Sequence, residues 1–252
     1  MTIRGIIFDI NGTLVDISTN EMHDGVYRVM SNLLSYQGIF LDPELLKETY
    51  FKIMRRQFES GGEKFPEFDA SGIFREIITL YSTDFTRGLP PEKLEQLPLF
   101  LAETFRAASL FHLRPYPEVE GVIKALHSKY RLAAVSDGQA AYVVAELNAV
   151  GLLGYFDPVV VSGDFGYRKP DVRLFETALD TMHLGAREVL FVGNDMYRDV
   201  YGANASGIKT IFFKSENSCS ENEVVKPDYI INNFNELLDI VECPRLTPAR
   251  LR

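Results

Sequence analysis

Residues 8–16 read FDINGTLVD, and three of their side chains are of types that can handle phosphate. Asp9 follows the apolar run RGIIF and precedes a turn through Gly12, with Thr13 close enough to contact it. A carboxylate in this position can attack phosphorus and form an aspartyl-phosphate, which divides one difficult hydrolysis into two easier steps. Asn11 is the unusual residue, because its amide can act neither as a general acid nor as a general base at neutral pH.

Other residues suited to the same chemistry end or follow strand-like runs farther along the chain. They are Ser136, Asp137, Gly138, Lys169, Asp195 and Asp199. The carboxyl ends of parallel strands meet at one edge of a sheet, and ligands of open α/β sheets bind there. We therefore expect an acid, a hydroxyl, a cation and a pair of acids to converge with Asp9 on a single site.

The acids and one main-chain group could hold Mg²⁺, which prefers oxygen ligands from one or two carboxylates, water and phosphate. Asp9, Asp195 and Asp199 could supply the carboxylates, and the carbonyl of Asn11 a neutral oxygen. We expect Asp195 to be a direct ligand, with Asp199 as a second ligand or as its hydrogen-bonded support.

The remaining groups could bind the phosphate of a substrate. Ser136, Asp137 and Gly138 precede a predicted helix, so the serine hydroxyl and the free N–H groups of that helix could contact phosphate oxygens. Lys169 would offset the negative charge, and Thr13 would hold the nucleophilic carboxylate. Each residue taken alone also fits a helix cap or a solvated loop position. Their ordered recurrence at strand ends favours a site.

The apolar pattern indicates which elements position these residues. The first predicted strand, residues 3–9, is apolar on both faces, as expected for a central strand of a parallel sheet. From residue 115 onward, strands of five to seven apolar residues alternate with helical patterns, which indicates βαβ crossovers. We predict a Rossmann-like, doubly wound parallel α/β core from residues 1–16 and 115–245, with 246–252 as a frayed tail.

Residues 17–114 interrupt this core with long patterns that repeat apolar residues every three or four positions. They predict an inserted, all-helical cap domain that closes over the site and excludes water. We expect its hinges near residues 16–20 and 113–117. Cap cations that could bind an anionic part of a substrate are Arg55, Arg56 and Lys64.

Four motifs in this order, together with the place of the insert, resemble the haloacid dehalogenase (HAD) superfamily in its helical-cap branch. The motifs are DINGT at 9–13, VSDG at 135–138, RKPD at 168–171 and GNDMYRD at 193–199. The resemblance implies a Mg²⁺-dependent phosphatase of a small phosphorylated metabolite. It implies that Asp9 is the nucleophile, that Ser136 and Lys169 bind phosphate or the nucleophile, and that the acids of the fourth motif hold the metal.

Two positions depart from the pattern of that family. Its phosphatases usually carry Asp at the position of Asn11, where the carboxyl acts as general acid and then as general base. They often carry a Gly-Asp pair where this chain has Gly193 and Asn194, although Asp195 is adjacent. The first departure predicts slow turnover.

Two alternatives stay open at this point. In a 2-haloacid dehalogenase-like hydrolase Asp9 would attack carbon, and halide would leave without a proton. GNDMYRD argues against this reaction, because a metal site is of no use to a displacement at carbon. The second alternative is a HAD-like domain with impaired turnover that binds a phosphorylated ligand or a partner.

Composition narrows the class of protein. The chain has 252 residues, 46% of them apolar, and a net charge of −9 with scattered Lys and Arg, which argues against a nucleic-acid or anionic-membrane surface. Only two cysteines, Cys219 and Cys243, and four well-separated histidines argue against a redox pair or a zinc site. With no leader or spanning apolar run, we expect a cytoplasmic monomer or homodimer whose partner is a small phosphate ester.

Overall fold

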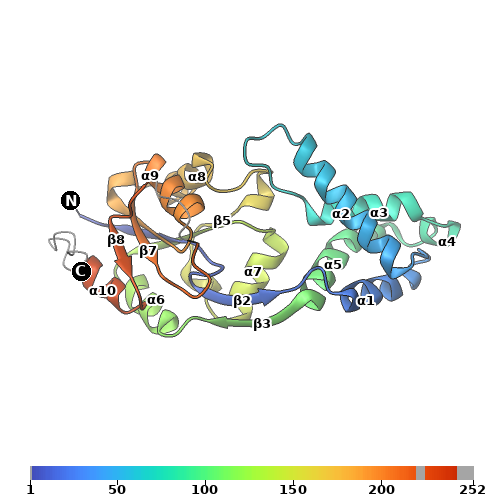
Figure 1. Cartoon of the computed structure of the whole chain (residues 1–252), viewed down its shortest axis with the longest axis horizontal. Helices are drawn as coiled ribbons and strands as arrows, with labels where there is room; N and C mark the ends of the chain where they lie inside the picture. The colour runs from blue at the N-terminus through green and yellow to red at the C-terminus, as the bar shows by residue number, and fades with distance from the viewer. Residues whose placement is uncertain (1, 220–224, 243–252) are drawn as a thin grey trace.

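The structure is a computed structural model that describes residues 2–219 and 225–242 of the chain. An α/β core lies at one end, a helical cap lies at the other, and a two-stranded ribbon connects them (Figure 1). The predicted frayed tail, 246–252, and Cys243 lie outside the described residues.

The core contains a six-stranded parallel sheet in the order β5-β4-β1-β6-β7-β8. The strands are β1 (Gly5–Phe8), β4 (Arg131–Ser136), β5 (Val159–Val161), β6 (Val189–Gly193), β7 (Lys209–Phe213) and β8 (Tyr229–Ile231). Strand β1 lies between β4 and β6, so Ile7 pairs with Ala133 on one side and with Phe191 on the other. The predicted central position of the first strand and the doubly wound parallel fold are confirmed.

Helices cover both faces of this sheet, because successive side chains of a strand point to opposite faces. Ile6 and Phe8 pack in one apolar cluster with residues of α6, and Ile7 packs in a second cluster with Phe175 of α8. The core helices are α6 (Val119–His127), α7 (Ala140–Ala149), α8 (Val172–Met182), α9 (Gly202–Ala205) and α10 (Glu236–Glu242), with a π-helical turn at Met196–Tyr201. Both clusters hold the strand ends in place.

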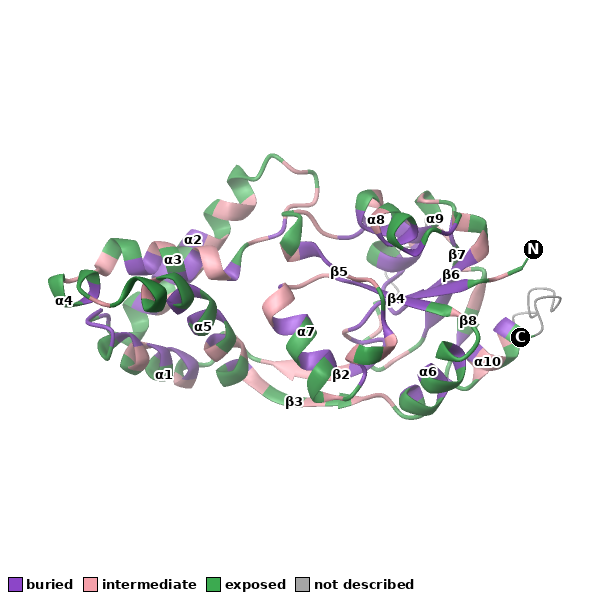
Figure 2. Ribbon diagram, turned by 180° about the vertical axis from the view of Figure 1, so that it is seen from behind, coloured by how far each residue is buried: buried purple, intermediate pink, exposed green. Residues whose placement is uncertain are grey.

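The cap has its own apolar core, which Tyr142 of α7 joins from the core domain. Its helices are α1 (Asp24–Ser35), α2 (Pro43–Ser60), α3 (Ala70–Tyr81), α4 (Asp84–Arg87) and α5 (Pro91–Ser109). Tyr50 stacks on Phe105 with ring centroids 4.5 Å apart, and both side chains are fully buried. Asp42 caps α2 by accepting from two backbone N–H groups, with Pro43 in the first turn as the sequence predicts. Figure 2 shows the buried helix faces of the cap and the buried strands of the core as two interiors.

A two-stranded antiparallel ribbon of β2 (Val15–Thr19) and β3 (Leu110–Pro115) carries the chain into and out of the cap. The predicted domain boundaries and hinges fall on this ribbon, and its strands are an addition to the expected helices. Asp16 of β2 accepts two hydrogen bonds from Arg114 and lies 3.0 Å from His112 Nε2. Those hydrogen bonds from His112 and Arg114 lower the pKa of Asp16.

The loop between α2 and α3 also docks the cap on the core. Glu67 N donates to Gly166 O at 2.9 Å, and Arg168 N donates to Phe65 O at 2.8 Å. Gln139 of the core donates from its side chain to the carbonyl of Phe68 at 2.6 Å. The cap is therefore closed over the carboxyl ends of the strands. Within the described residues, every helix is too short or too polar to cross a bilayer.

Candidate active site

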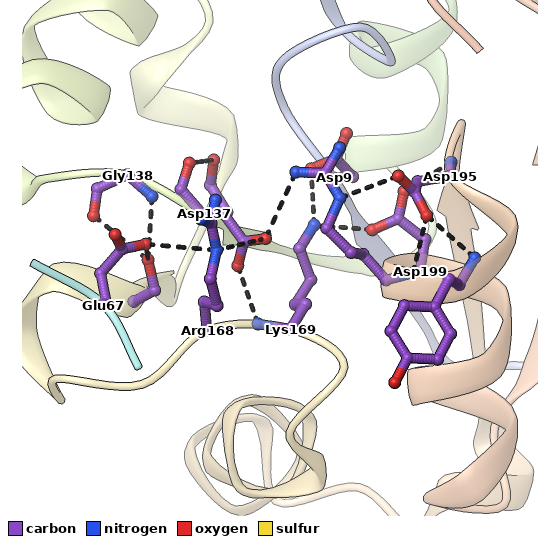
Figure 3. A network of polar contacts seen from close by, with 12 residues as sticks. Asp9, Glu67, Asp137, Gly138, Arg168, Lys169, Asp195 and Asp199 are labelled. Carbon is purple, nitrogen blue, oxygen red and sulfur yellow. Dashed lines mark hydrogen bonds and ion pairs between the residues drawn. The ribbon is translucent and has the colours of Figure 1, made fainter. Parts of the chain in front are cut away.

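Asp9 lies directly after β1, where its carboxylate is buried and held at both oxygens. Its Oδ1 accepts from Lys169 Nζ at 2.7 Å, and its Oδ2 accepts from Thr13 Oγ1 at 2.7 Å (Figure 3). The turn after Asp9 requires Gly12, because φ is +84° there and a Cβ would lie 2.3 Å from Nδ2 of Asn194. The sequence thus places one fixed, 5% exposed carboxylate at the end of the central strand.

Lys169 joins Asp9 to the fourth motif. Its Nζ donates to Asp9, to Asp199 Oδ1 at 2.6 Å and to the carbonyl of Val135 at 3.2 Å, so all three ammonium hydrogens are used. Burial alone would lower the pKa of Lys169, but the facing carboxylates of Asp199 and Asp9 raise it above its ordinary value. The lysine is therefore a fixed positive charge in the site.

Asp199 approaches the end of β6 closely. Its Oδ2 accepts from the backbone N–H groups of Asn194 and Asp195, each at 3.0 Å. A Cβ at Gly193 would lie 2.5 Å from this carboxylate, which explains the glycine at that position. Burial raises the pKa of Asp199, and the Lys169 ammonium opposes that shift. Both oxygens of Asp199 are therefore occupied by protein donors.

Asp195 has a different environment from the one we expected. Its Oδ1 accepts from the backbone N–H groups of Tyr197 and Arg198, and its Oδ2 accepts from Arg198 Nε at 2.8 Å. Burial would raise the pKa of Asp195, but the hydrogen bonds from Arg198 lower it. This carboxylate caps the following helical turn and does not contact Asp9.

Asn194 occupies the place next to the nucleophile instead. Its Oδ1 lies 3.3 Å from Thr13 Oγ1, and its Nδ2 donates to Asn217 O at 2.9 Å. Residues 2–219 and 225–242 contain no group of three or more Asp, Glu, His or Cys side chains arranged to hold a metal. The donor set still fits Mg²⁺, because the Asp9 carboxylate and the Asn194 amide oxygen are hard ligands that water and a substrate phosphate can complete.

The residues after β4 fix the loop that carries Lys169. Asp137 Oδ1 accepts from the backbone N–H of Lys169 at 2.9 Å. Ser136 is buried at the strand end, and the N–H of Gly138 donates to Ser162 Oγ at 2.9 Å. The structure therefore gives Asp137 a positioning role. It leaves the Ser136 hydroxyl, whose shortest contact is 3.5 Å, as the group open to phosphate.

A cavity of about 190 Å³ lies between cap and core beside this site. Asn11 lines it, and the Oδ1 atom of Asn11 is buried with no hydrogen-bond partner among the described residues. Glu21, Glu67 and Arg106 line it from the cap side.

The three cap cations expected from the sequence do not line this cavity. Arg56 pairs with Glu76, Lys64 lies 5.0 Å from the centroid of the Phe65 ring, and Arg55 lines a separate groove on the cap. Asn11, Asp137 and Gly138, which the sequence does indicate, line it together with residues that it does not, among them Glu67, Arg106 and Glu146. One signal was available, since Glu146 is the only charged residue of QAAYVVAELNAVG, a helix that is otherwise largely apolar.

Comparisons with known proteins agree with this geometry. The family model for haloacid dehalogenase-like hydrolases matches residues 3–207, which contain all four motifs. A glyceraldehyde 3-phosphate phosphatase from Methanothermobacter thermautotrophicus is 28% identical over 247 residues, which cover 95% of this chain and 100% of that protein.

Solved structures show the same fold. A 2-haloacid dehalogenase from Pseudomonas syringae superposes with a TM-score of 0.68 at 21% identity, over 96% of this chain and 99% of that one. A HAD phosphatase from Thermococcus onnurineus gives 0.58 at 22% identity, over 95% and 98%.

Proposed function

This chain belongs to the haloacid dehalogenase-like hydrolases, and on that premise we propose that it hydrolyses small phosphate monoesters through an aspartyl-phosphate on Asp9. The observation that carries the proposal is the buried Asp9 carboxylate, held by Lys169 and Thr13 beside a cavity under the closed cap. The phosphatase named among its relatives supports phosphorus rather than carbon as the centre attacked.

In the proposed reaction a carboxylate oxygen of Asp9 forms a bond to phosphorus while the bond to the leaving oxygen breaks. The leaving oxygen takes a proton from water. A second water then attacks the phosphoryl group, which releases phosphate and a proton and restores Asp9. Lys169 and Thr13 orient the carboxylate, and the Ser136 hydroxyl can donate to a phosphoryl oxygen.

Asn11 makes both proton transfers dependent on water. Its amide can hydrogen-bond to the leaving oxygen or to the attacking water but can neither give nor take a proton. General acid–base catalysis typically contributes about 10²–10⁴-fold in rate. We therefore propose an enzyme that favours esters with good leaving groups.

Mg²⁺ would be held by Asp9, by the amide oxygen of Asn194 and by the main-chain carbonyl of Asn11. When bound, the ion would neutralise charge on the phosphoryl oxygens. Asp199 would act through Lys169, and Asp195 would order the fourth motif as a helix cap.

Dehalogenation is the second candidate, and one observation favours it. Asn11, which lines the cavity, has no proton that it can donate as an acid, and a halide leaves without needing one. In that reaction Asp9 would form a bond to carbon as the carbon–halogen bond breaks, and water would hydrolyse the resulting ester.

One assay separates the two candidates. The purified protein with Mg²⁺ is given p-nitrophenyl phosphate, an alkyl phosphate and 2-chloropropionate, and the release of phosphate and of chloride is measured. We expect phosphate release that the Asp9→Asn variant loses and that the exposed control Asp239→Asn on α10 keeps. Chloride release without phosphate release would reject the proposal.

A further inference from the structure

Five residues that line the same cavity each have a buried polar atom with no hydrogen-bond partner among the described residues. The atoms are Asn11 Oδ1, Asp137 Oδ2, Tyr142 Oη, Glu146 Oε2 and Arg168 Nε. Buried polar groups in folded proteins are nearly always hydrogen-bonded, because an unmade bond costs roughly 1–3 kcal/mol. Five such atoms around one space call for a polar partner, either water or a ligand.

The positive charges of this cavity are already matched by carboxylates. Arg106 Nε donates to Glu146 Oε1 at 2.6 Å, and Arg106 Nη1 lies 3.5 Å from Glu21 Oε1. Arg168 Nε lies 3.7 Å from Glu67 Oε2 and 3.6 Å from Asp137 Oδ2. These six side chains bring four negative and two positive charges. Arg198, 3.6 Å from Asp137 Oδ2, is itself paired with Asp195, so another carboxylate entering the cavity would meet no cation without a carboxylate partner.

The atoms without partners call for hydrogen-bond donors on the ligand. Asn11, Asp137 and Glu146 each offer an acceptor oxygen, and the Tyr142 hydroxyl can accept or donate. Arg168 Nε is the one atom of the five that can only donate, and two carboxylates already lie near it. Burial raises the pKa of Glu67, which lines the same cavity.

We propose that this cavity is a leaving-group pocket that selects phosphate monoesters whose leaving group carries hydroxyl or amino hydrogens and no carboxylate. The inference rests on the proposed function, since the reacting phosphate must lie at Asp9 for the rest of the ester to reach Asn11 and Arg168. The cavity, at about 190 Å³, is smaller than the roughly 300–1,000 Å³ of pockets for drug-sized ligands, so the leaving group is short.

Three esters of nearly equal size test the selectivity: 2-hydroxyethyl phosphate, O-phosphoethanolamine and 2-phosphoglycolate. Their affinities are measured by calorimetry with Mg²⁺ on the Asp9→Asn variant, which cannot form the phosphoryl intermediate. We expect the hydroxyl or the amino ester to bind at least about tenfold more tightly than 2-phosphoglycolate. Whichever of 2-hydroxyethyl phosphate and O-phosphoethanolamine binds more tightly shows whether the pocket prefers a hydroxyl or an amino group. Equal or tighter binding of 2-phosphoglycolate would overturn the proposal.

Variants of α7, made in the same Asp9→Asn background, test which side chains select. Glu146→Gln removes the nearer of the two carboxylates that face Arg106 and leaves Glu21 as its only partner, so we expect the preference against 2-phosphoglycolate to fall about tenfold. Tyr142→Phe should weaken the binding of 2-hydroxyethyl phosphate about fivefold and should weaken the binding of 2-phosphoglycolate less. Glu103→Gln on the exposed face of α5 is the control and should change neither affinity.

An unchanged preference in Glu146→Gln, checked for folding by its thermal melt, would overturn the proposal. If Glu146→Gln does not fold, Tyr142→Phe takes its place, and an unchanged preference in that variant would overturn the proposal. Tyr142→Phe should fold, because the Tyr142 hydroxyl has no hydrogen-bond partner among the described residues that the substitution would remove. The affinities are measured without turnover, so they test the pocket independently of the proposed reaction. Selective binding without phosphate release by the wild type would reject the proposed function alone, and release from p-nitrophenyl phosphate without selectivity would reject the pocket alone.

Discussion

The Lys169 ammonium lies 2.7 Å from a carboxylate oxygen of Asp9, and both side chains are buried. The same nitrogen lies 2.6 Å from Asp199, so one positive charge serves two carboxylates. Removing one member of a buried ion pair leaves an uncompensated charge.

Replacing this lysine by an apolar residue should therefore cost stability as well as activity. We expect Lys169→Met to lower the free energy of unfolding by about 3–5 kcal/mol and to abolish phosphate release. Urea denaturation measures the first effect, and a phosphate assay the second. Lys93→Met, on the exposed face of α5, is the matched control. Wild-type stability in Lys169→Met would show that the ion pairs do not form in solution.

Restoring a carboxyl at position 11 should speed the proposed reaction. We expect Asn11→Asp to raise the turnover of an alkyl phosphate by about 10²–10⁴-fold, because the leaving oxygen then receives a proton from the protein. Turnover of p-nitrophenyl phosphate should rise less, since that leaving group needs no proton. Unchanged alkyl phosphate turnover, with Asp9 still essential, would mean that Asn11 does not mark a missing proton carrier.

Adjacent residues of the fourth motif should differ in their effect on Mg²⁺. We expect Asn194→Asp to tighten Mg²⁺ binding about tenfold, because it adds a carboxylate beside Asp9. Asp195→Asn should change Mg²⁺ affinity little and weaken the cap of the Met196–Tyr201 turn by about 0.5–2 kcal/mol. Calorimetric titration of Mg²⁺ and thermal melts measure these quantities. The opposite order would make Asp195 the metal ligand, as the sequence alone suggested.

Glu67 should make stability depend on pH. Burial raises its pKa in the folded protein, while Arg168 lowers it and Asp137 raises it further. A carboxyl with a raised pKa binds its proton more tightly in the folded state. Its contribution to stability is therefore complete below its ordinary pKa of 4.5 and is lost as the pH rises through the folded value.

We accordingly compare the free energies of unfolding of the wild type and of Glu67→Gln. We expect the wild-type value minus the variant value to decrease as the pH rises from 4 to 7. Denaturant unfolding of both proteins across this range measures it, and the glutamine variant supplies the non-titrating reference. A difference that rises with pH would show that Arg168 outweighs burial at this carboxylate.

The loop between α2 and α3, which docks the cap on the core, should become more protected from hydrogen exchange when a phosphate mimic binds. If ligand holds the cap shut, tungstate should slow hydrogen exchange at Glu67 N and Arg168 N, whose hydrogen bonds join cap to core. The ribbon of β2 and β3 should change less, because its hydrogen bonds persist when the cap moves. Equal exchange with and without tungstate at the docking loop would argue against a moving cap.

The sequence predicts the core well because its signals are local. Apolar strand runs identify β1, β4 and β6. The motif at the end of β1 places Asp9 and the RKPD motif after β5 places Lys169, and the structure brings these two side chains into contact. The ribbon has no such signal, since β2 and β3 are short, partly exposed and continuous with helical patterns.

Side-chain direction and long-range assembly are what the sequence leaves open. Asn194 and Asp195 are neighbours, yet backbone alternation sends one toward Thr13 and the other into a helix cap. The cavity combines residues from segments far apart in the chain, so no spacing predicts it. These residues include Glu21, Glu67, Arg106 and Glu146.

The pair of Arg106 and Glu146 also affects the kinetics of recognition. Arg106 comes from α5 of the cap and Glu146 from α7 of the core, so the leaving-group pocket is complete only while cap and core are in contact. A ligand arriving at an open protein meets Asp9 and the strand ends before it meets this pocket. Matched and mismatched esters should then associate at similar rates and differ mainly in how long they stay.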